Sequence, residues 1–178
     1  MRGEVGIEIA PLLDATGRSL GERVDALLRR TCTVARALSG AEQAALKLWI
    51  DEDPGKARKY FSLSEKYEKY GGFRVDPRGL GLHGMTIPPG DVVRLTQEEV
   101  EHHPLWQNFG DVAAEHPPMR GWLATSICGE GGRNYGLLQL SDKSDGREFT
   151  AGDEAHIREL AALVGETLDA LRAVAQSR

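Results

Sequence analysis

Residues 135–154, YGLLQLSDKSDGREFTAGDE, decide the fold, because they join an extended apolar run to the start of a long amphipathic pattern. The run Tyr135–Ser141 predicts a strand, and the pattern that follows predicts a helix. Thr150 and Asp153 have the spacing of a capping box at the start of that helix. Asp153 and Glu154 then fall in its first turn, where the positive end of the helix dipole stabilises carboxylates.

The connection between this strand and this helix carries a second group of residues that predict its geometry. Asp142 and Lys143 end the strand, and Lys143 is expected to form an ion pair with Asp153 across the turn. Such a pair would set the angle between the last strand and the last helix. Phe149 is expected to fill the space beneath the connection. A Lys–Asp pair can also act in catalysis, but this spacing favours a structural clamp.

The rest of the chain predicts one α+β domain. The first expected elements are a helix over 19–38 and strands over 44–50 and 57–67, which a turn over 51–55 joins. An irregular segment over 71–90, with one helical turn near Leu80, Leu82 and His83, then leads to a strand over 91–95 and a helix from 96 towards 115 that is interrupted at Pro104. The last expected elements are strands over 122–128 and 135–141, joined by a loop over 129–132, and a helix over 151–176. Strands outnumber the connecting helices, which favours an antiparallel sheet over a doubly wound parallel one. The domain is expected to span 19–176, after an N-terminal extension over 1–18.

Composition and charge argue against several classes of function. Apolar residues make up 40% of the chain and charged residues 28%, as in an ordinary globular protein. A net charge of −5 without a Lys/Arg block argues against nucleic-acid binding. No apolar run approaches the ~18 residues of a membrane span, and no signal peptide is expected. Cys32 and Cys128 form no CxxC pair and are expected to be buried free thiols, which favours a cytoplasmic location.

The pattern of Asp142-Lys143, Phe149 and Asp153-Glu154 resembles the Asn-Lys…Phe-x-x-x-Asp-Glu signature of GAF domains, the cytoplasmic small-molecule sensor modules of signalling proteins. Asp142 is the one departure, since the family usually has Asn there. Other parts of the chain are similar to the GAF domains of bacterial multi-domain sensor histidine kinases, namely 94–100, Trp106, 116–118, 121–127, 131–134 and 136–143. The resemblance extends from about Val34 to Leu171.

This resemblance implies an architecture and a role. The architecture is a central antiparallel sheet of five to six strands, with the N- and C-terminal helices on one face and a ligand pocket on the other, roofed by short helices and loops within 71–118. The helices 19–38 and 151–176 are implied to form a homodimer bundle that passes ligand binding to a histidine kinase or another output domain of a two-component system. The signature residues are implied to stabilise the fold rather than to contact the ligand. We expect either an excised sensor or a stand-alone regulator.

Four of the candidate ligand contacts are aromatic or imidazole side chains. His83 lies in GLGLHG, residues 79–84, where the irregular segment should cross the pocket. It is either a polar contact of the ligand or a loop histidine held by backbone groups. Trp106, Phe109 and Trp122 offer a stacking wall for a planar ligand, or alternatively fill the core between helix and sheet.

The other three candidates are Arg120, Thr125 and Gln139. Arg120 can pair with a phosphate or carboxylate of a ligand, or alternatively with Glu115 or a backbone carbonyl. Thr125 and Gln139 lie in predicted strands and carry polar atoms suited to a pocket wall, although a single sequence does not assign their faces.

The histidines do not predict a cofactor. In GAF domains that bind bilins a Cys-His pair attaches the chromophore, whereas Leu82 precedes His83 here, so no covalent bilin is expected. His102 and His103 are consecutive and would point in different directions on a helix. His156 has no second His or Cys at metal-ligand spacing. No metal or haem is therefore expected, and the identity of a ligand stays open.

Three alternatives to a general small-molecule sensor remain. A ligand-free dimerisation module would fill the pocket with its own Trp106, Phe109 and Trp122. A cyclic-nucleotide receptor is a special case of the sensor. Some GAF-fold proteins reduce free methionine sulfoxide with a cluster of cysteines, but Cys32 and Cys128 lie on separate elements and supply no nucleophile with a resolving partner. No enzyme activity is expected.

Overall fold

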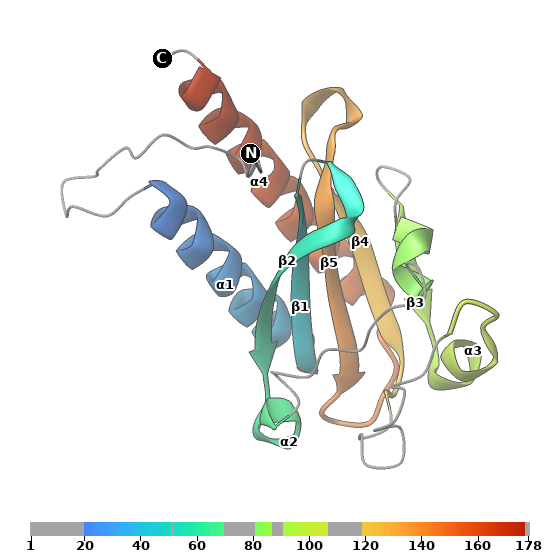
Figure 1. Cartoon of the computed structure of the whole chain (residues 1–178). Helices are drawn as coiled ribbons and strands as arrows, with labels where there is room; N and C mark the ends of the chain where they lie inside the picture. Colours follow the sequence, from blue (N-terminus) through green and yellow to red (C-terminus); the bar gives the residue numbers. More distant parts are fainter. Residues whose placement is uncertain (1–19, 51, 70–80, 87–90, 107–118, 177–178) are drawn as a thin grey trace.

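The computed structural model describes residues 20–50, 52–69, 81–86, 91–106 and 119–176 (Figure 1). The described elements, in chain order, are α1 (Leu20–Ser39), β1 (Ala41–Ile50), β2 (Asp53–Leu63), α2 (Glu65–Glu68), the 3-10 helix η1 (Gly81–Thr86), β3 (Val92–Leu95), α3 (Gln97–His102), β4 (Trp122–Cys128), the 3-10 turn η3 (Glu130–Gly132), β5 (Asn134–Lys143) and α4 (Ala151–Gln176). The strands form one antiparallel sheet in the order β2-β1-β5-β4-β3. The α+β fold class predicted from the sequence is confirmed, with five strands in the sheet.

Side chains alternate between the two faces of this sheet, so each row of paired residues belongs to one face. One row crosses all five strands and comprises Tyr60, Leu46, Leu138, Thr125 and Val92. The next row comprises Phe61, Ala45, Gln139, Ala124 and Val93 and lies on the opposite face. We call the face that carries Leu46 the helix face and the face that carries Gln139 the outer face.

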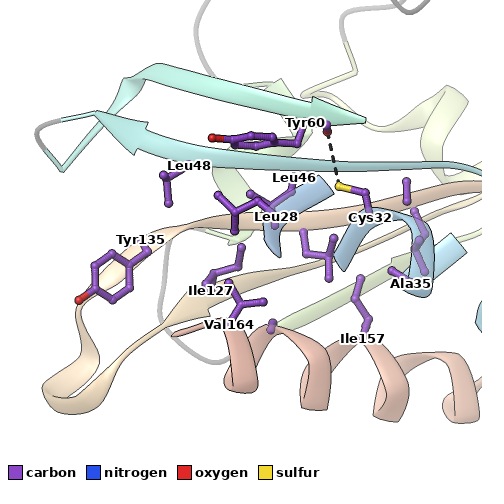
Figure 2. Close-up of a cluster of buried hydrophobic side chains, with 14 of the residues drawn as sticks. Leu28, Cys32, Ala35, Leu46, Leu48, Tyr60, Ile127, Tyr135, Ile157 and Val164 are labelled. Carbon is purple, nitrogen blue, oxygen red and sulfur yellow. Dashed lines mark hydrogen bonds between the residues drawn. The ribbon is translucent and has the colours of Figure 1, made fainter. Parts of the chain in front are cut away.

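Both terminal helices pack on the helix face (Figure 1). Figure 2 shows Leu28 and Cys32 of α1 and Val164 of α4 against Leu46 and Ile127 of the sheet. The Cys32 thiol donates a hydrogen bond to the carbonyl oxygen of Tyr60, at 3.6 Å. Burying this apolar face supplies most of the driving force for folding, because free energy scales with apolar area removed from water.

In the connection from β5 to α4, residues of the stretch 135–154 contact one another closely. Lys143 Nζ lies 3.0 Å from Asp153 Oδ2, and both side chains are largely buried. Asp153 Oδ2 also accepts a hydrogen bond from the Thr150 backbone at 2.7 Å, and Thr150 Oγ1 accepts one from the Asp153 backbone at 3.3 Å. Phe149 is buried in the main core. These contacts attach the start of α4 to the end of the sheet.

Several predicted boundaries are wrong. The strand expected over 57–67 ends at Leu63, because the chain turns at Ser64 into α2 and buries Tyr67. The turn expected over 51–55 is shorter, since β2 already begins at Asp53 and Glu52 takes the positive φ of 58° that reverses the chain. The helix expected from 96 onward ends at His102, two residues before Pro104, and its expected continuation over 107–118 lies outside the described residues.

Gly136 allows β1 and β5 to approach each other closely, because it has no side chain. Its φ is 155°, and a Cβ atom there would lie 1.9 Å from the carbonyl oxygen of Lys47. A larger residue would force the two central strands apart.

Among the described residues, no helix combines the length and the apolar character that crossing a membrane requires.

Candidate functional site

The outer face of the sheet carries a second, smaller apolar cluster. Trp122 and Ala124 of β4 are buried against Leu82 of η1 and Val100 of α3. Partly buried neighbours surround them, namely Met85, Val93, Leu95, Trp106 and Met119. This cluster holds η1 and α3 over the β4 side of the outer face, so that η1 faces the central strands.

His83 of η1 connects three strands at this face. Its Nδ1 lies 3.0 Å from Lys47 Nζ of β1, and its Nε2 lies 2.6 Å from Gln139 Oε1 of β5. Its ring meets the ring of Trp122 edge-on, with centroids 6.1 Å apart and planes at 67°. An ammonium group only donates hydrogen bonds, so Nδ1 accepts from Lys47 and the proton resides on Nε2, which donates to Gln139. The imidazole is therefore neutral in this arrangement.

Lys47 is a half-buried cation on the outer face. Burial, together with the positive charge of Lys59, lowers the pKa of Lys47 to about 8. Lys59 is its direct cross-strand partner on β2. Both effects disfavour the protonated amine, because it loses water and meets a like charge. Lys47, His83, Gln139 and Trp122 form what we call the outer-face site.

The structure distributes the seven candidate ligand contacts unequally. It brings His83, Trp122 and Gln139 together at the outer-face site, and Trp106 packs in the adjacent apolar cluster. Thr125 lies on the helix face, where it is buried and donates a hydrogen bond to the Asp91 carbonyl at 3.2 Å. Thr125 and Gln139, whose faces the sequence left open, therefore lie on opposite faces, because Thr125 pairs with Leu138, the neighbour of Gln139 on β5. Phe109 lies outside the described residues.

Arg120 lies at the end of the sheet beside Asp142, the departure from the usual signature. The Asp142 carboxylate is fully buried and accepts hydrogen bonds at Oδ2 from Lys66 Nζ and from the Tyr67 hydroxyl. Arg120 Nε lies 4.0 Å from Asp142 Oδ1. Burial and the Asp142 carboxylate raise the pKa of Tyr67 well above its ordinary value. A carboxylate suits two cationic neighbours, whereas the amide of an asparagine would turn donors toward one of them.

Sequence reasoning missed Lys47, Lys66 and Tyr67. Lys47 is the single charged residue in AALKLWI, residues 44–50, and this isolated charge in an apolar strand is the signal that could have identified it. Lys66 and Tyr67 were placed at the end of a strand, so nothing local connected them to Asp142, which follows them by about 75 residues.

The two cysteines are free and differ in their surroundings. Cys32 is fully buried, and this burial raises the pKa of its thiol to about 12. The thiol of Cys128 contacts the Ser126 hydroxyl at 3.3 Å near the end of β4. Cys32 is expected to remain protonated and unreactive, because the thiolate is the nucleophile. The described part of the chain contains no group of three or more His, Cys, Asp or Glu side chains arranged to hold a metal ion.

A family model described as a GAF domain matches residues 21–169, which includes all five strands and most of both terminal helices. Solved structures show the same fold. One is the GAF domain of a phosphoenolpyruvate-protein phosphotransferase from Coxiella burnetii, with 20% identity, a TM-score of 0.64 and 84% of each chain covered.

Two further structures extend the comparison to proteins of different activity. A type II free methionine-R-sulfoxide reductase from Thermoplasma acidophilum has 14% identity and a TM-score of 0.62, over 86% of this chain and 97% of that one. A domain of a two-component sensor histidine kinase protein, described as putative, from Sinorhizobium meliloti 1021 has 14% identity and a TM-score of 0.56, over 88% and 95%. At these identities the likeness establishes the shared fold.

Proposed function

This chain belongs to the GAF domain family, and on that premise we propose that it is a small-molecule-sensing regulatory domain of bacterial signal transduction. The sensory unit spans residues 19–176, with 1–18 as an N-terminal extension. A ligand binds on the outer face of the sheet, and the terminal helices pass the change to a histidine kinase or another output domain. The two-component sensor with the same fold supports this assignment.

The observation that carries the proposal is the position of His83. A short helix from a separate segment places its imidazole between Lys47 of β1 and Gln139 of β5, beside Trp122 of β4. Polar side chains from two strands therefore converge on one segment, next to the buried ring of Trp122 on a third strand. Convergent polar groups in an otherwise apolar setting are typical of small-molecule sites.

The signal is proposed to leave through a parallel homodimer bundle of α1 and α4. These helices lie side by side on the helix face (Figure 1). Their outward surfaces keep apolar residues in solvent: Val34 and Leu38 on α1 are 44% and 54% exposed, and Leu163 and Val174 on α4 are 61% and 44% exposed. Exposed apolar residues on two adjacent helices suit a second copy of the chain. For a ligand to send a signal, it must favour one arrangement of this bundle over another.

A ligand-free dimerisation module is the second candidate, and one observation favours it. Trp122 is only 1% exposed, and Trp106 packs in the same apolar cluster. These aromatic rings occupy part of the space over β4 that a planar ligand would otherwise fill. Of the two candidates, the sensor accounts better for the polar groups of Lys47, His83 and Gln139, which an apolar filler would not need.

We propose that the domain has no enzyme activity, although a methionine sulfoxide reductase shares its fold. A thiol mechanism needs an activated nucleophile and a resolving partner. Cys32 is buried on the helix face with a raised pKa, and Cys128 contacts Ser126 on another element. Free thiols on separate elements also support a cytoplasmic location.

The experiment that tests the proposed function compares native and denatured mass spectra of the purified protein. We expect a dimer that carries a small-molecule adduct, and we expect denaturation to release the adduct. The mass of the adduct would then identify the ligand. A dimer that stays unliganded after incubation with a lysate of its native host would contradict the sensor and support the dimerisation module.

A further inference from the structure

We propose that the ligand of the outer-face site carries an anionic group, a carboxylate or a phosphate, that pairs with Lys47 and Lys59. This inference rests on the proposed sensory function and specifies the chemistry of its ligand.

The register of the first two strands places two cations together. Lys47 of β1 and Lys59 of β2 are directly opposite each other on the outer face. Like charges directly opposite each other on neighbouring strands destabilise a sheet. An apolar residue at either position would remove the repulsion between the two ammonium groups, yet the chain has a lysine at both. A negatively charged group between the two ammonium groups would turn the repulsion into attraction.

These two cations have no carboxylate partner among the described residues. Other basic residues of the same hairpin do have one: Lys56 lies 3.5 Å from Asp53, and Arg58 lies 3.2 Å from Asp25. Apart from the cation Lys59, the described neighbours of Lys47 are uncharged: Leu137 is its partner on β5, and the neutral imidazole of His83 accepts its hydrogen bond. The charge of Lys47 is held in place but not neutralised.

The electrostatic state of Lys47 also favours binding of an anion. Its pKa is lowered to about 8, first by burial and then by Lys59, and no acid opposes these effects. A carboxylate or phosphate beside Nζ would favour the ammonium form and raise this pKa again. The free energy that the protein loses by holding the unpaired cation is thus recovered when an anion binds.

The recognition has a defined geometry. His83 Nδ1 fixes the direction of Lys47 Nζ, and Gln139 fixes the imidazole through Nε2. Lys59 is exposed, so it supplies charge rather than a fixed contact.

The test uses three probes of similar shape: benzoate, phenyl phosphate and the neutral benzamide. The protein is labelled with 13C-lysine, and the Lys47 Cε resonance is assigned from its absence in Lys47→Met. We expect benzoate or phenyl phosphate at millimolar concentration to shift this resonance and to raise the pH midpoint of its titration. Benzamide is expected to leave both unchanged. The two anions distinguish a carboxylate ligand from a phosphate ligand.

Three variants locate the effect. Lys47→Met is expected to weaken binding of the better anion about tenfold or more, because it removes a charge-assisted hydrogen bond. Lys59→Met is expected to weaken it about threefold, since an exposed charge contributes less. Lys56→Met is the matched control, because Lys56 belongs to the same strand as Lys59 but pairs with Asp53, and it is expected to bind as the unmodified chain does.

The inference is overturned if benzamide binds as tightly as benzoate, if neither anion binds, or if Lys47→Met binds the anion with unchanged affinity. Each of these outcomes leaves the sensory function standing when the native mass spectrum shows a bound, neutral small molecule. An absent adduct combined with anion binding at Lys47 would instead contradict the sensor and keep the anion site.

Discussion

The Nε2 atom of His83 lies 2.6 Å from Gln139 Oε1, and this hydrogen bond joins the short helix η1 to the central strand β5. The same imidazole accepts a hydrogen bond from Lys47 of β1 at Nδ1. One neutral side chain thus connects a segment of the outer face to two strands whose opposite face carries the terminal helices.

Gln139→Leu is expected to release η1 from β5. The variant loses the acceptor for His83 Nε2 and should be destabilised by about 1 kcal/mol. Hydrogen exchange of residues 81–86 is expected to become faster, while exchange in α4 stays the same. Gln97→Leu on α3, where the Gln97 side chain bonds to Glu101 of the same helix, serves as the control. Unchanged exchange over 81–86 would show that His83 does not hold η1.

Asp142→Asn, which restores the residue usual in the family signature, is expected to destabilise this chain. The amide turns a donor toward Lys66 or Arg120 in a fully buried position, at a cost of about 1–3 kcal/mol. Urea unfolding measures this cost, and the cost should be smaller in a Lys66→Met background. The exposed Glu166→Gln on α4 is the carboxylate-to-amide control and should leave stability unchanged. An Asp142→Asn variant as stable as the original chain would contradict the role assigned to the carboxylate.

The difference in stability between the original chain and Lys47→Met is expected to depend on pH. The folded-state pKa of Lys47 is about 8, below its ordinary value of 10.5, so the folded state disfavours the bound proton. Between these two pH values the unfolded chain binds more protons, and stability therefore rises with pH relative to Lys47→Met. The gain should be of order 1–3 kcal/mol and should be absent below pH 7. Denaturant midpoints from pH 7 to 10 measure it. A flat difference would contradict the lowered pKa.

Gly165→Ala is expected to destabilise the domain, although alanine is the better helix former. A Cβ atom at Gly165 would lie 2.0 Å from the carbonyl oxygen of Cys128, so α4 would have to move away from β4. Such overpacking costs about 1–3 kcal/mol. Gly152→Ala in the same helix meets only Thr150 Oγ1 at 3.5 Å and is the matched control, expected to be neutral or stabilising. Thermal unfolding of both variants decides the question; a stabilised Gly165→Ala would show that α4 does not pack this closely.

Leu163→Lys is expected to dissociate the proposed homodimer without unfolding the domain. Leu163 is 61% exposed on α4, so a charge there is tolerated in the monomer but unfavourable in an apolar interface. Sedimentation velocity should show dimer affinity reduced about tenfold or more. Phe61→Lys, at an exposed apolar site of the edge strand β2 on the outer face, opposite the helix face, is the control. If the original chain sediments as a monomer, the bundle is excluded.

Local patterns accounted for the elements of the fold more readily than for the site. The capping boxes at Thr96 and Thr150 are short-range features of the backbone, and both helix starts were placed within one residue. The end of β2 was misplaced, because the turn into α2 depends on Tyr67 reaching the buried Asp142. That contact joins residues far apart in the sequence.

The sequence by itself determined the family, the antiparallel sheet and the junction of β5 with α4, because periodicity, capping and the signature residues act over a few positions of the chain. Only the tertiary structure decided which polar side chains meet. The face of Thr125 and of Gln139 depends on strand register, and the opposition of Lys47 and Lys59 depends on the pairing of two strands. The approach of His83 to both Lys47 and Gln139 requires a distant segment to cross the sheet. These contacts are non-local. The residue pattern of a strand specifies which side chains alternate between its two faces, but it does not specify which strand pairs with it or in what register.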